Sequence, residues 1–147
     1  MSKSRRVFAL LLTAILAFTC FTPDSSGVNL QNEQGSYPIF YEIFVYSFCD
    51  SDGDGVGDLN GITSKLDYLQ ELGVSGIWLT PIHPATTYHK YDVMDYYDID
   101  PQFGTLEDFD NFMAACQERG IAVILDLVLN HSSSLHPWFQ EAKTYLE

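Results

Sequence analysis

Basic residues and cysteines are both scarce in this sequence. Seven Lys and Arg stand against 20 Asp and Glu among 147 residues, which gives a formal net charge of −13 at pH 7. Nucleic acids and anionic membranes are bound by clustered Lys and Arg, so this balance argues against both as partners. The three cysteines are Cys20, Cys49 and Cys116. Cys49 and Cys116 lie in different predicted elements among apolar residues, which favours packed free thiols over a disulfide.

The sequence also lacks an apolar run long enough to cross a membrane. The stretch Val7–Phe18 is shorter than the ~20 residues that a transmembrane helix needs. Basic residues precede it and small or turn-forming residues follow it, which is typical of a secretory leader. We therefore predict a signal peptide over residues 1–27, a linker over residues 28–36 and a folded domain over residues 37–147 of a secreted, extracytoplasmic bacterial protein. A lipid-anchored form acylated at Cys20 is the alternative.

Hydrophobic patterning predicts alternating strands and helices. An aromatic and β-branched run favours a first strand, and Gly73 ends a helix whose leucines share one face. Thr105 and Asp108 form a capping box, which predicts a helix start. The predicted elements are strands over residues 39–48, 75–80 and 121–129, helices over residues 63–72 and 105–120, and a further helix from His136. Connections in this order are right-handed and give a parallel sheet or barrel.

Polar residues mark the end of the third predicted strand. The run Ile121–Leu129 is apolar on both faces except at Asp126, which predicts a central strand covered on both sides. A charge there is costly to bury unless a partner pairs with it. Asn130 and His131 follow directly, and the carboxyl ends of parallel strands are where α/β proteins build their sites.

The loop after the first predicted strand carries carboxylates at alternate positions. Its first, third, fifth and ninth residues are Asp and its sixth is Gly55, an arrangement that suits Ca²⁺. The twelfth residue is Gly61 instead of the Glu of an EF-hand, and a strand instead of a helix precedes the loop. We therefore predict a Ca²⁺ site without an EF-hand switch. Its expected ligands are Asp50, Asp52, Asp54, Asp58 and the backbone carbonyl of Val56.

The loop over residues 88–101 interleaves tyrosines with carboxylates. An aromatic face packs on the C–H side of a sugar ring, and carboxylates accept hydrogen bonds from its hydroxyls. The composition therefore favours a neutral polyhydroxylated ligand. For Tyr96 and Tyr97 we favour a packing role instead.

These segments together resemble the amino-terminal part of the alpha-amylase superfamily, glycoside hydrolase family thirteen. The matching stretches are Tyr41–Ile62, Gly73–Pro81, Tyr88–Thr105 and Gly120–His131. The resemblance implies the α/β class, as the N-terminal three βα units of a (β/α)8 TIM barrel that is truncated here. It also implies a retaining glycoside hydrolase that acts on the α-glucosidic bonds of starch-like glucans, with Ca²⁺ as its cofactor.

The same resemblance implies roles for individual residues. Tyr91 would stack on the sugar at the cleavage subsite, and His131 would hydrogen-bond the primary hydroxyl of that sugar. Asp126 would hold an arginine near the nucleophile, and Asn130 would ligate a second, structural calcium. Lys90 stands where the family usually has glycine, which alters the rim of the substrate cleft. The expected substrate-binding set is Tyr91, His131, His89 and Asp92.

No catalytic residue is expected in this chain. The resemblance places the nucleophile after a fourth strand and the general acid/base after a fifth, whereas Glu147 comes soon after the third predicted strand. A whole barrel needs ~250 residues, and an unpaired third strand exposes an apolar edge. We therefore expect residues 28–147 alone to be inactive and poorly soluble. The alternatives are a Ca²⁺-dependent, non-enzymatic carbohydrate-binding module and a structural Ca²⁺-binding domain. Among enzymes, amylase, α-1,6-glucosidase and trehalose-type activities stay open.

Overall fold

The structure of this protein, a computed structural model, describes residues 38–145. These residues lie within the unit Tyr37–Glu147. The predicted signal peptide, the predicted linker and the acylation site at Cys20 lie outside the described residues. No helix within residues 38–145 is long and apolar enough to cross a membrane.

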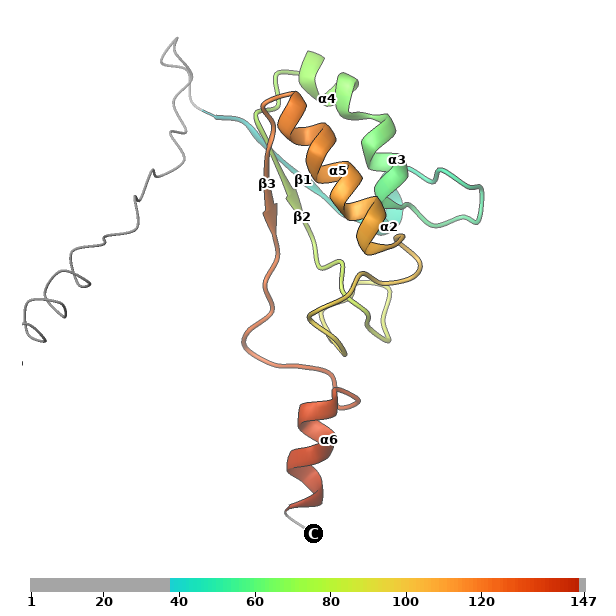
Figure 1. Cartoon of the computed structure of the whole chain (residues 1–147), viewed down its shortest axis with the longest axis vertical. Coiled ribbons are helices and arrows are strands. Elements are labelled where there is room, and N and C mark those ends of the chain that lie inside the picture. The colour runs from blue at the N-terminus through green and yellow to red at the C-terminus, as the bar shows by residue number, and fades with distance from the viewer. Residues whose placement is uncertain (1–37, 146–147) are drawn as a thin grey trace, which may run out of the picture. The chain divides into compact units, whose positions relative to one another are not determined.

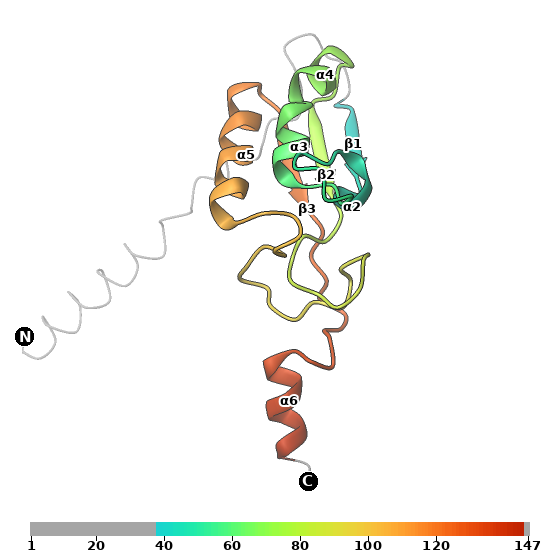
Figure 2. The ribbon, with the colours of Figure 1, turned by 90° about the vertical axis from the view of Figure 1, so that its right-hand side faces the viewer.

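A parallel sheet forms the centre of the described residues. Its strands are β1 (Phe40–Ile43), β2 (Gly76–Leu79) and β3 (Ala122–Leu125), in that spatial order. Helices α3 (Leu59–Ser64), α4 (Leu66–Glu71) and α5 (Leu106–Glu118) lie on one face of the sheet (Figures 1 and 2). Ile43 is in register with Leu79, and Leu79 is in register with Leu125. The predicted alternation of strands and helices and the predicted parallel sheet are confirmed.

The first strand is shorter than predicted. The helix α2 (Val45–Phe48) replaces its second half, so the prediction of a strand that continues through Phe48 is wrong. Val45 is fully buried in the core, and the backbone amide of Gly57 donates to the carbonyl of Tyr46 at 2.7 Å. Aromatic and β-branched residues favour strands as a rule, but tertiary contacts override that preference. Here the burial of Val45 and this hydrogen bond stabilise a helical turn.

The first predicted helix begins earlier than expected and is broken in two. α3 begins after Asp58, whose side chain accepts a hydrogen bond from the Gly61 amide at 2.7 Å. This N-cap satisfies an amide that has no partner within the helix. Lys65 separates α3 from α4, because its φ of −106° and ψ of 4° depart from helical values. Gly73 follows α4 with a φ of +86°, which favours glycine, and it ends the helix as predicted.

The two later helices begin where the sequence predicts. The Thr105 amide donates to the Asp108 carboxylate at 2.8 Å, and the Asp108 amide donates to the Thr105 hydroxyl at 3.2 Å. This capping box opens α5. The helix α6 (Pro137–Thr144) begins after His136, whose ring accepts a hydrogen bond from the Trp138 amide at 3.1 Å. Both helix starts are confirmed.

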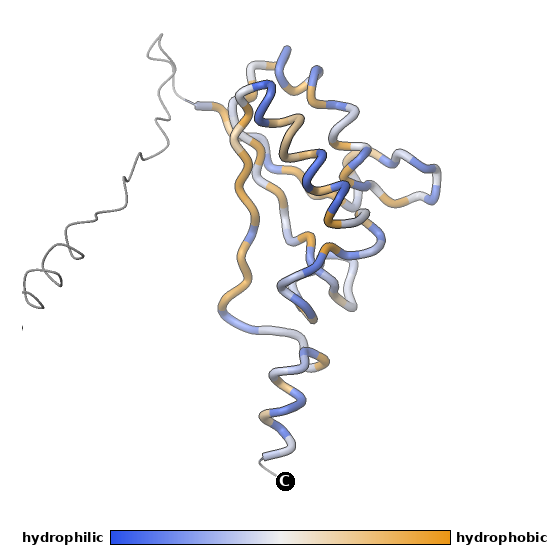
Figure 3. Tube along the Cα trace, in the orientation of Figure 1, coloured by the Kyte–Doolittle hydropathy of each residue, from blue (hydrophilic) through white to orange (hydrophobic). Residues whose placement is uncertain are grey.

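The third strand ends early and lies at an edge of the sheet. β3 stops at Leu125, and among the described residues it pairs only with β2. Ile124 is 47% exposed and Leu129 is 79% exposed, so the prediction of a central strand covered on both sides is wrong for residues 38–145. The tube in Figure 3 is mostly orange along this stretch, which marks hydrophobic residues. An apolar sequence pattern indicates that these residues are suited to burial. They are exposed here because the described part of the chain contains no layer that covers them.

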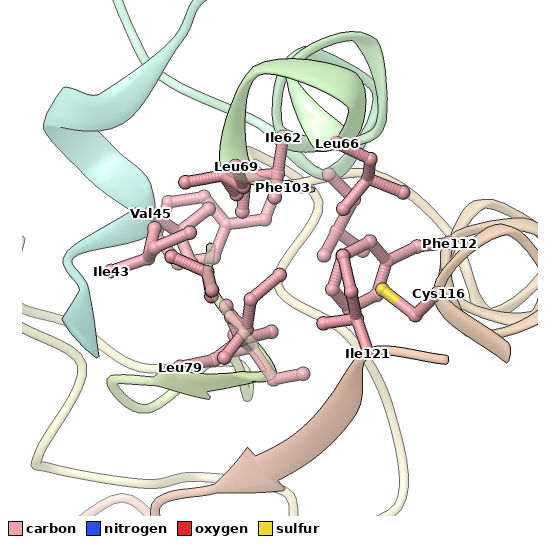
Figure 4. Packing of buried hydrophobic residues seen from close by; sticks show 14 of the residues in the cluster. Ile43, Val45, Ile62, Leu66, Leu69, Leu79, Phe103, Phe112, Cys116 and Ile121 are labelled. Carbon is pink, nitrogen blue, oxygen red and sulfur yellow. The ribbon is translucent and has the colours of Figure 1, made fainter. Parts of the chain in front are cut away.

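The core lies between the sheet and its helices. Ile43 and Leu79 from the strands face Leu66 and Phe112 from the helices, and each of the four is at most 1% exposed (Figure 4). Burial of apolar side chains of this size stabilises a fold by about 1.5–3 kcal/mol for each side chain. This core supports the strand ends from which the long loops leave.

Both cysteines of the described part are free thiols, as predicted. Cys116 is 1% exposed within the core. Burial raises the pKa of the Cys116 thiol to about 11, although the positive charge of Arg119 acts in the opposite direction. Cys116 is therefore a packing residue and not a nucleophile.

Candidate functional site

The candidate site is built from two loops at the carboxyl ends of β2 and β3. Residues 80–105 follow β2 and residues 126–136 follow β3, and both lie beyond the same end of the sheet (Figure 1). The Asp126 amide donates to the Leu79 carbonyl at 3.0 Å, which continues the pairing with β2 beyond the end of β3. The Ser133 amide donates to the Val93 carbonyl at 2.8 Å and joins the two loops. The parallel sheet therefore brings distant parts of the chain to one edge.

Tyr91 and Asp126 link the two loops directly. The Tyr91 hydroxyl donates to Asp126 Oδ2 at 2.6 Å. This hydrogen bond, followed by partial burial and by the charges of Asp126 and Glu42, raises the pKa of Tyr91 to about 12. The hydroxyl therefore stays protonated at neutral pH and holds the ring in one orientation, with the residue 39% exposed. Within residues 38–145 no arginine contacts Asp126, and the arginine contact that the resemblance implies stays a prediction.

His89 and Asp92 are held by hydrogen bonds within their own turn. His89 Nδ1 accepts a hydrogen bond from the Tyr91 amide at 3.1 Å, and the Thr87 hydroxyl oxygen lies 3.1 Å from the same nitrogen. Both oxygens of Asp92 are occupied, because they accept hydrogen bonds from the hydroxyls and amides of Thr86 and Thr87. Burial disfavours the charged carboxylate, but these hydrogen bonds outweigh it and lower the pKa of Asp92 to about 2. The ionised Asp92 carboxylate therefore stabilises the turn through these hydrogen bonds. Its sugar-binding role stays a prediction.

Sequence reasoning treated Lys90 only as a replacement for glycine and missed where its side chain lies. Its φ of +60° is the one positive value at a non-glycine position among residues 38–145. The residue is 2% exposed, and its ammonium nitrogen lies 2.7 Å from both Asp100 Oδ2 and Gln102 Oε1. The one sequence feature that marks this position is a lysine where the family usually has glycine. That feature does not identify Asp100 and Gln102 as the partners of the ammonium.

Asn130 and His131 lie exposed in the second loop. The side-chain amide of Asn130 lies 3.2 Å from His131 Nδ1, and the Tyr96 hydroxyl donates to the His131 carbonyl at 3.1 Å. The Tyr96 ring also stacks on the Trp138 ring with centroids 6.1 Å apart, so the packing role predicted for Tyr96 is confirmed. Tyr97 is 79% exposed, so the packing role predicted for it is wrong within residues 38–145.

A groove of about 480 Å³ lies beside His131. Aromatic rings and leucine side chains form most of its lining, which includes Tyr96, Tyr97, Leu127, Leu129, His131 and Trp138. Tyr91, His89 and Asp92 are not part of this lining. Of the four predicted substrate-binding residues, His131 alone lines this groove.

The predicted calcium loop gathers three of its carboxylates. Oxygen atoms of Asp50, Asp52 and Asp58 lie within 4.8 Å of one another. The amides of Gly53 and Gly55 donate to Asp50 at 2.7 and 2.9 Å, and these hydrogen bonds lower the pKa of Asp50. Carboxylates this close repel one another unless donors or a cation compensate them. Three hard oxygen ligands at this separation fit Ca²⁺.

The other residues of the loop explain why it is not an EF-hand. Asp54 lies outside the cluster of three, and its carboxylate accepts a hydrogen bond from the Val56 amide at 2.7 Å. Gly61 lies inside α3, where an added Cβ would come 1.9 Å from the Cys49 carbonyl oxygen. A glutamate therefore does not fit at the twelfth position of the loop.

The sequence matches a known protein family over most of its length. Residues 42–147 match the family model described as the catalytic domain of alpha amylase. The chain belongs to the alpha-amylase family. Alpha-amylase 3 of Dictyoglomus thermophilum is 60% identical over 101 residues, which is 69% of this chain and 20% of that protein. The glucan 1,6-alpha-glucosidase of Streptococcus dysgalactiae subsp. equisimilis is 50% identical over 104 residues, which is 70% of this chain and 19% of that protein.

A solved structure of the family shows the same fold. Eubacterium rectale Amy13B superposes with a TM-score of 0.72 at 57% sequence identity, covering 73% of this chain and 21% of that one. The match confirms the resemblance and the α/β class, because the described strands and helices are the parallel βα units of the alpha-amylase TIM barrel. This alpha-amylase family chain spans about a fifth of the length of these relatives.

Proposed function

We propose that this chain contributes the amino-terminal part of a retaining glycoside hydrolase that acts on α-glucosidic bonds of starch-like glucans. Membership of the alpha-amylase family supports the reaction class. The observation that carries the proposal is the hydrogen bond between Tyr91 and Asp126, which presents a partly exposed ring at the carboxyl ends of the strands. A ring held in this way can stack on the apolar face of a glucose unit.

The described residues bind and orient the sugar in this proposal. Retaining glycosidases use a nucleophile and a general acid/base that lie about 5–5.5 Å apart, and the resemblance places both after strands later than β3. Asp126 sets the orientation of the Tyr91 hydroxyl before the sugar arrives. His131 donates to a sugar hydroxyl, and His89 and Asp92 shape the turn that forms the rim of the site.

The two relatives named above have different names, and only one of the names states a linkage. One is an alpha-amylase and the other is a glucan 1,6-alpha-glucosidase, and both match this chain over about a hundred residues. The proposal therefore covers the α-glucosidic class as a whole, and assays with defined oligosaccharides assign the linkage.

The hydrolase proposal is tested with the complete gene product. We expect it to hydrolyse starch with retention of the anomeric configuration, and we expect residues 28–147 alone to be inactive. Tyr91→Ala should lower kcat/KM about tenfold or more. Tyr68→Ala is the matched control, because Tyr68 is 54% exposed on α4, at the end of the sheet away from the two loops, and should leave kcat/KM unchanged (Figure 1).

Three outcomes would contradict the hydrolase proposal or part of it. Glucan binding without hydrolysis by the complete gene product would favour the non-enzymatic binding module. Hydrolysis by residues 28–147 alone would show that the catalytic groups lie within them. Equal kcat/KM for Tyr91→Ala and the wild type would remove Tyr91 from the site.

The loop over residues 50–58 is proposed to bind Ca²⁺. Bound calcium would neutralise the clustered carboxylates and tie the loop to the start of α3 through Asp58. Asn130 is proposed as a ligand of a second, structural calcium. The proposed ligands of the first site are Asp50, Asp52, Asp54, Asp58 and the carbonyl of Val56.

Calorimetric titration with Ca²⁺ tests the first site. We expect Asp50→Asn to weaken binding about tenfold or more, because it removes one charge from the cluster. Asp110→Asn is the matched control, since Asp110 is an exposed carboxylate on α5. Equal affinities for the wild type and both variants would contradict a site in this loop.

Export by a signal peptide over residues 1–27 is also proposed, with acylation at Cys20 as the alternative. Mass spectrometry of the mature protein separates the two forms. A free amino terminus on protein from the culture medium supports secretion, and a lipid-modified cysteine on protein from the membrane supports the anchored form. An uncleaved chain in the cytoplasm would contradict both.

A further inference from the structure

Lys90 combines two features that are each unfavourable for a lysine. Its φ is +60°, a conformation that is strained for a residue with a Cβ. Its side chain is 3% exposed and that of Asp100 is 6% exposed, and a buried ammonium is unfavourable unless it is paired. Both features occur in the turn that carries His89 and Tyr91 on either side of Lys90.

The Lys90 ammonium has partners inside the protein. Its nitrogen lies 2.7 Å from Asp100 Oδ2 and 2.7 Å from Gln102 Oε1. It also lies 5.2 Å from the centroid of the Phe103 ring, which is within the range of a cation–π interaction. The charge is therefore compensated by the fold and is turned away from any sugar at the surface.

These partners are themselves anchored. The Asp100 amide donates to the Ile82 carbonyl at 2.8 Å, close to the end of β2. Phe103 is 1% exposed, and its carbonyl accepts a hydrogen bond from the Leu59 amide at the start of α3, at 3.0 Å. Figure 2 shows the loop over residues 80–105 beyond the end of the sheet. The Lys90 ammonium is thus held by residues that are anchored next to the core, and the Lys90 backbone belongs to the turn that carries His89 and Tyr91.

We propose that Lys90 is a positioning residue whose buried ion pair with Asp100 holds the turn that presents His89 and Tyr91 to a sugar. The inference rests on the proposed function, which makes Tyr91 the stacking ring. A glycine at this position would adopt the same φ without strain but would provide no anchor. The ion pair is therefore what the lysine adds, and Lys90 acts on the sugar only through its neighbours.

Lys90→Gly separates the two features, because it removes the anchor and relieves the backbone. In the complete gene product we expect kcat/KM for maltooligosaccharides to fall about tenfold or more, with KM rising by a larger factor than kcat falls. We also expect the pKa of Tyr91 to fall from about 12 towards 10.0 as its hydrogen bond to Asp126 loosens. Nuclear magnetic resonance of ring-labelled tyrosine, assigned with Tyr91→Phe, measures this titration.

Two controls separate positioning from stability. Leu69→Ala removes a fully buried side chain on α4, and it should lower stability without changing KM or the Tyr91 titration. Lys90→Met combined with Asp100→Asn removes both charges and keeps the apolar stem, so it should recover the stability that Lys90→Met loses. We expect the KM of this double variant to stay as high as that of Lys90→Gly.

The KM and the Tyr91 titration of Lys90→Gly decide whether Lys90 is a positioning residue. Unchanged KM and an unchanged Tyr91 titration in Lys90→Gly would overturn it, because the anchor would be dispensable. Equal effects of Leu69→Ala and Lys90→Gly would also overturn it, because the effect would follow stability alone. If the wild-type gene product hydrolyses no glucan, the proposed function fails, and the Tyr91 titration in Lys90→Gly still decides whether Lys90 positions the turn.

Discussion

A methyl group at Gly61 is expected to destabilise this fold more than the same change at Gly53. Gly61 lies in α3, and an added Cβ there would come 1.9 Å from the Cys49 carbonyl oxygen and 2.7 Å from the Cys49 carbonyl carbon. Nothing lies within 4 Å of a Cβ added at Gly53, where a φ of +86° alone opposes a side chain. The two positions therefore separate a packing clash from backbone strain.

Two opposing contributions set the size of the effect at Gly61. Alanine is more favourable than glycine in a helix interior by about 1 kcal/mol. The clash opposes it, because the Cys49 carbonyl would have to move by more than 1 Å before the contact passed 3.0 Å. Such overpacking costs about 1–3 kcal/mol and occasionally more. A contact of 1.9 Å places the clash at the upper end of this range, about 3 kcal/mol, so we expect Gly61→Ala to lose about 2 kcal/mol net. We expect Gly53→Ala to lose about 1 kcal/mol from its left-handed conformation.

Thermal unfolding followed by circular dichroism measures both variants. In the complete gene product, whose barrel has ~250 residues, Tm changes by roughly 2–4 °C for each kcal/mol. We therefore expect Gly61→Ala to lower Tm by about 6 °C and Gly53→Ala by about half as much. A chelator is present in both experiments, so that cation binding does not shift Tm. A Tm for Gly61→Ala at or above that of the wild type would refute the close approach of α3 to Cys49.

Three further predictions concern titratable groups. Asp126→Asn should lower the pKa of Tyr91 from about 12 towards 10.0, because the charged acceptor of its proton is lost; an absorbance titration of tyrosinate that matched the wild type would contradict this hydrogen bond. Thr87→Ala should raise the pKa of Asp92 from about 2 towards 3.8. Because the pKa of Asp92 is lower in the folded state than in the unfolded state, the ionised carboxylate stabilises the fold above pH 3.8, and this stabilisation is lost as the pH falls through about 2. The free energy of unfolding of Thr87→Ala should therefore depend less on pH than that of the wild type between pH 3.8 and about 2. Cys116 should resist alkylation in the folded chain, because burial raises the pKa of its thiol to about 11; alkylation faster than unfolding would contradict its burial.

The element order and most helix ends could be predicted because they depend on neighbours in the sequence. Thr105 and Asp108 cap each other across three positions, which a pattern of residue types detects. Gly73 and Gly120 adopt φ values of +86° and +67° where their helices end, and few residues other than glycine do so at low cost. Asp58 also caps a helix, but its spacing in the acidic loop indicates a metal ligand, so the predicted start of the helix lies too late in the sequence.

The features that could not be predicted depend on residues that are far apart or on a covering layer. Val45 turns into the core although its aromatic neighbours favour a strand. Ile124 is exposed because burial needs a partner surface as well as an apolar side chain. Lys90 reads as a surface residue in a polar loop, and only the path of the chain brings its ammonium to Asp100. The carboxylate of Asp126 needed a partner, and sequence reasoning did not identify that partner as Tyr91.

Polar side-chain bonds, more than apolar packing, hold the candidate sugar-binding turn. The Tyr91 hydroxyl is hydrogen-bonded to Asp126, and the Asp92 carboxylate is hydrogen-bonded to Thr87. The Lys90 ammonium is paired with the buried carboxylate of Asp100. Such bonds are directional, so the loss of one donor or acceptor reorients a side chain without opening a cavity in the core. The core side chains that support the strands are at most 1% exposed and apolar, and their loss lowers the free energy of unfolding instead. Substitutions at the more exposed Tyr91–Asp126 bond should therefore change sugar recognition at nearly constant stability, whereas the loss of one partner of the buried Lys90–Asp100 pair should lower stability as well. Substitutions in the core should lower stability without changing sugar recognition.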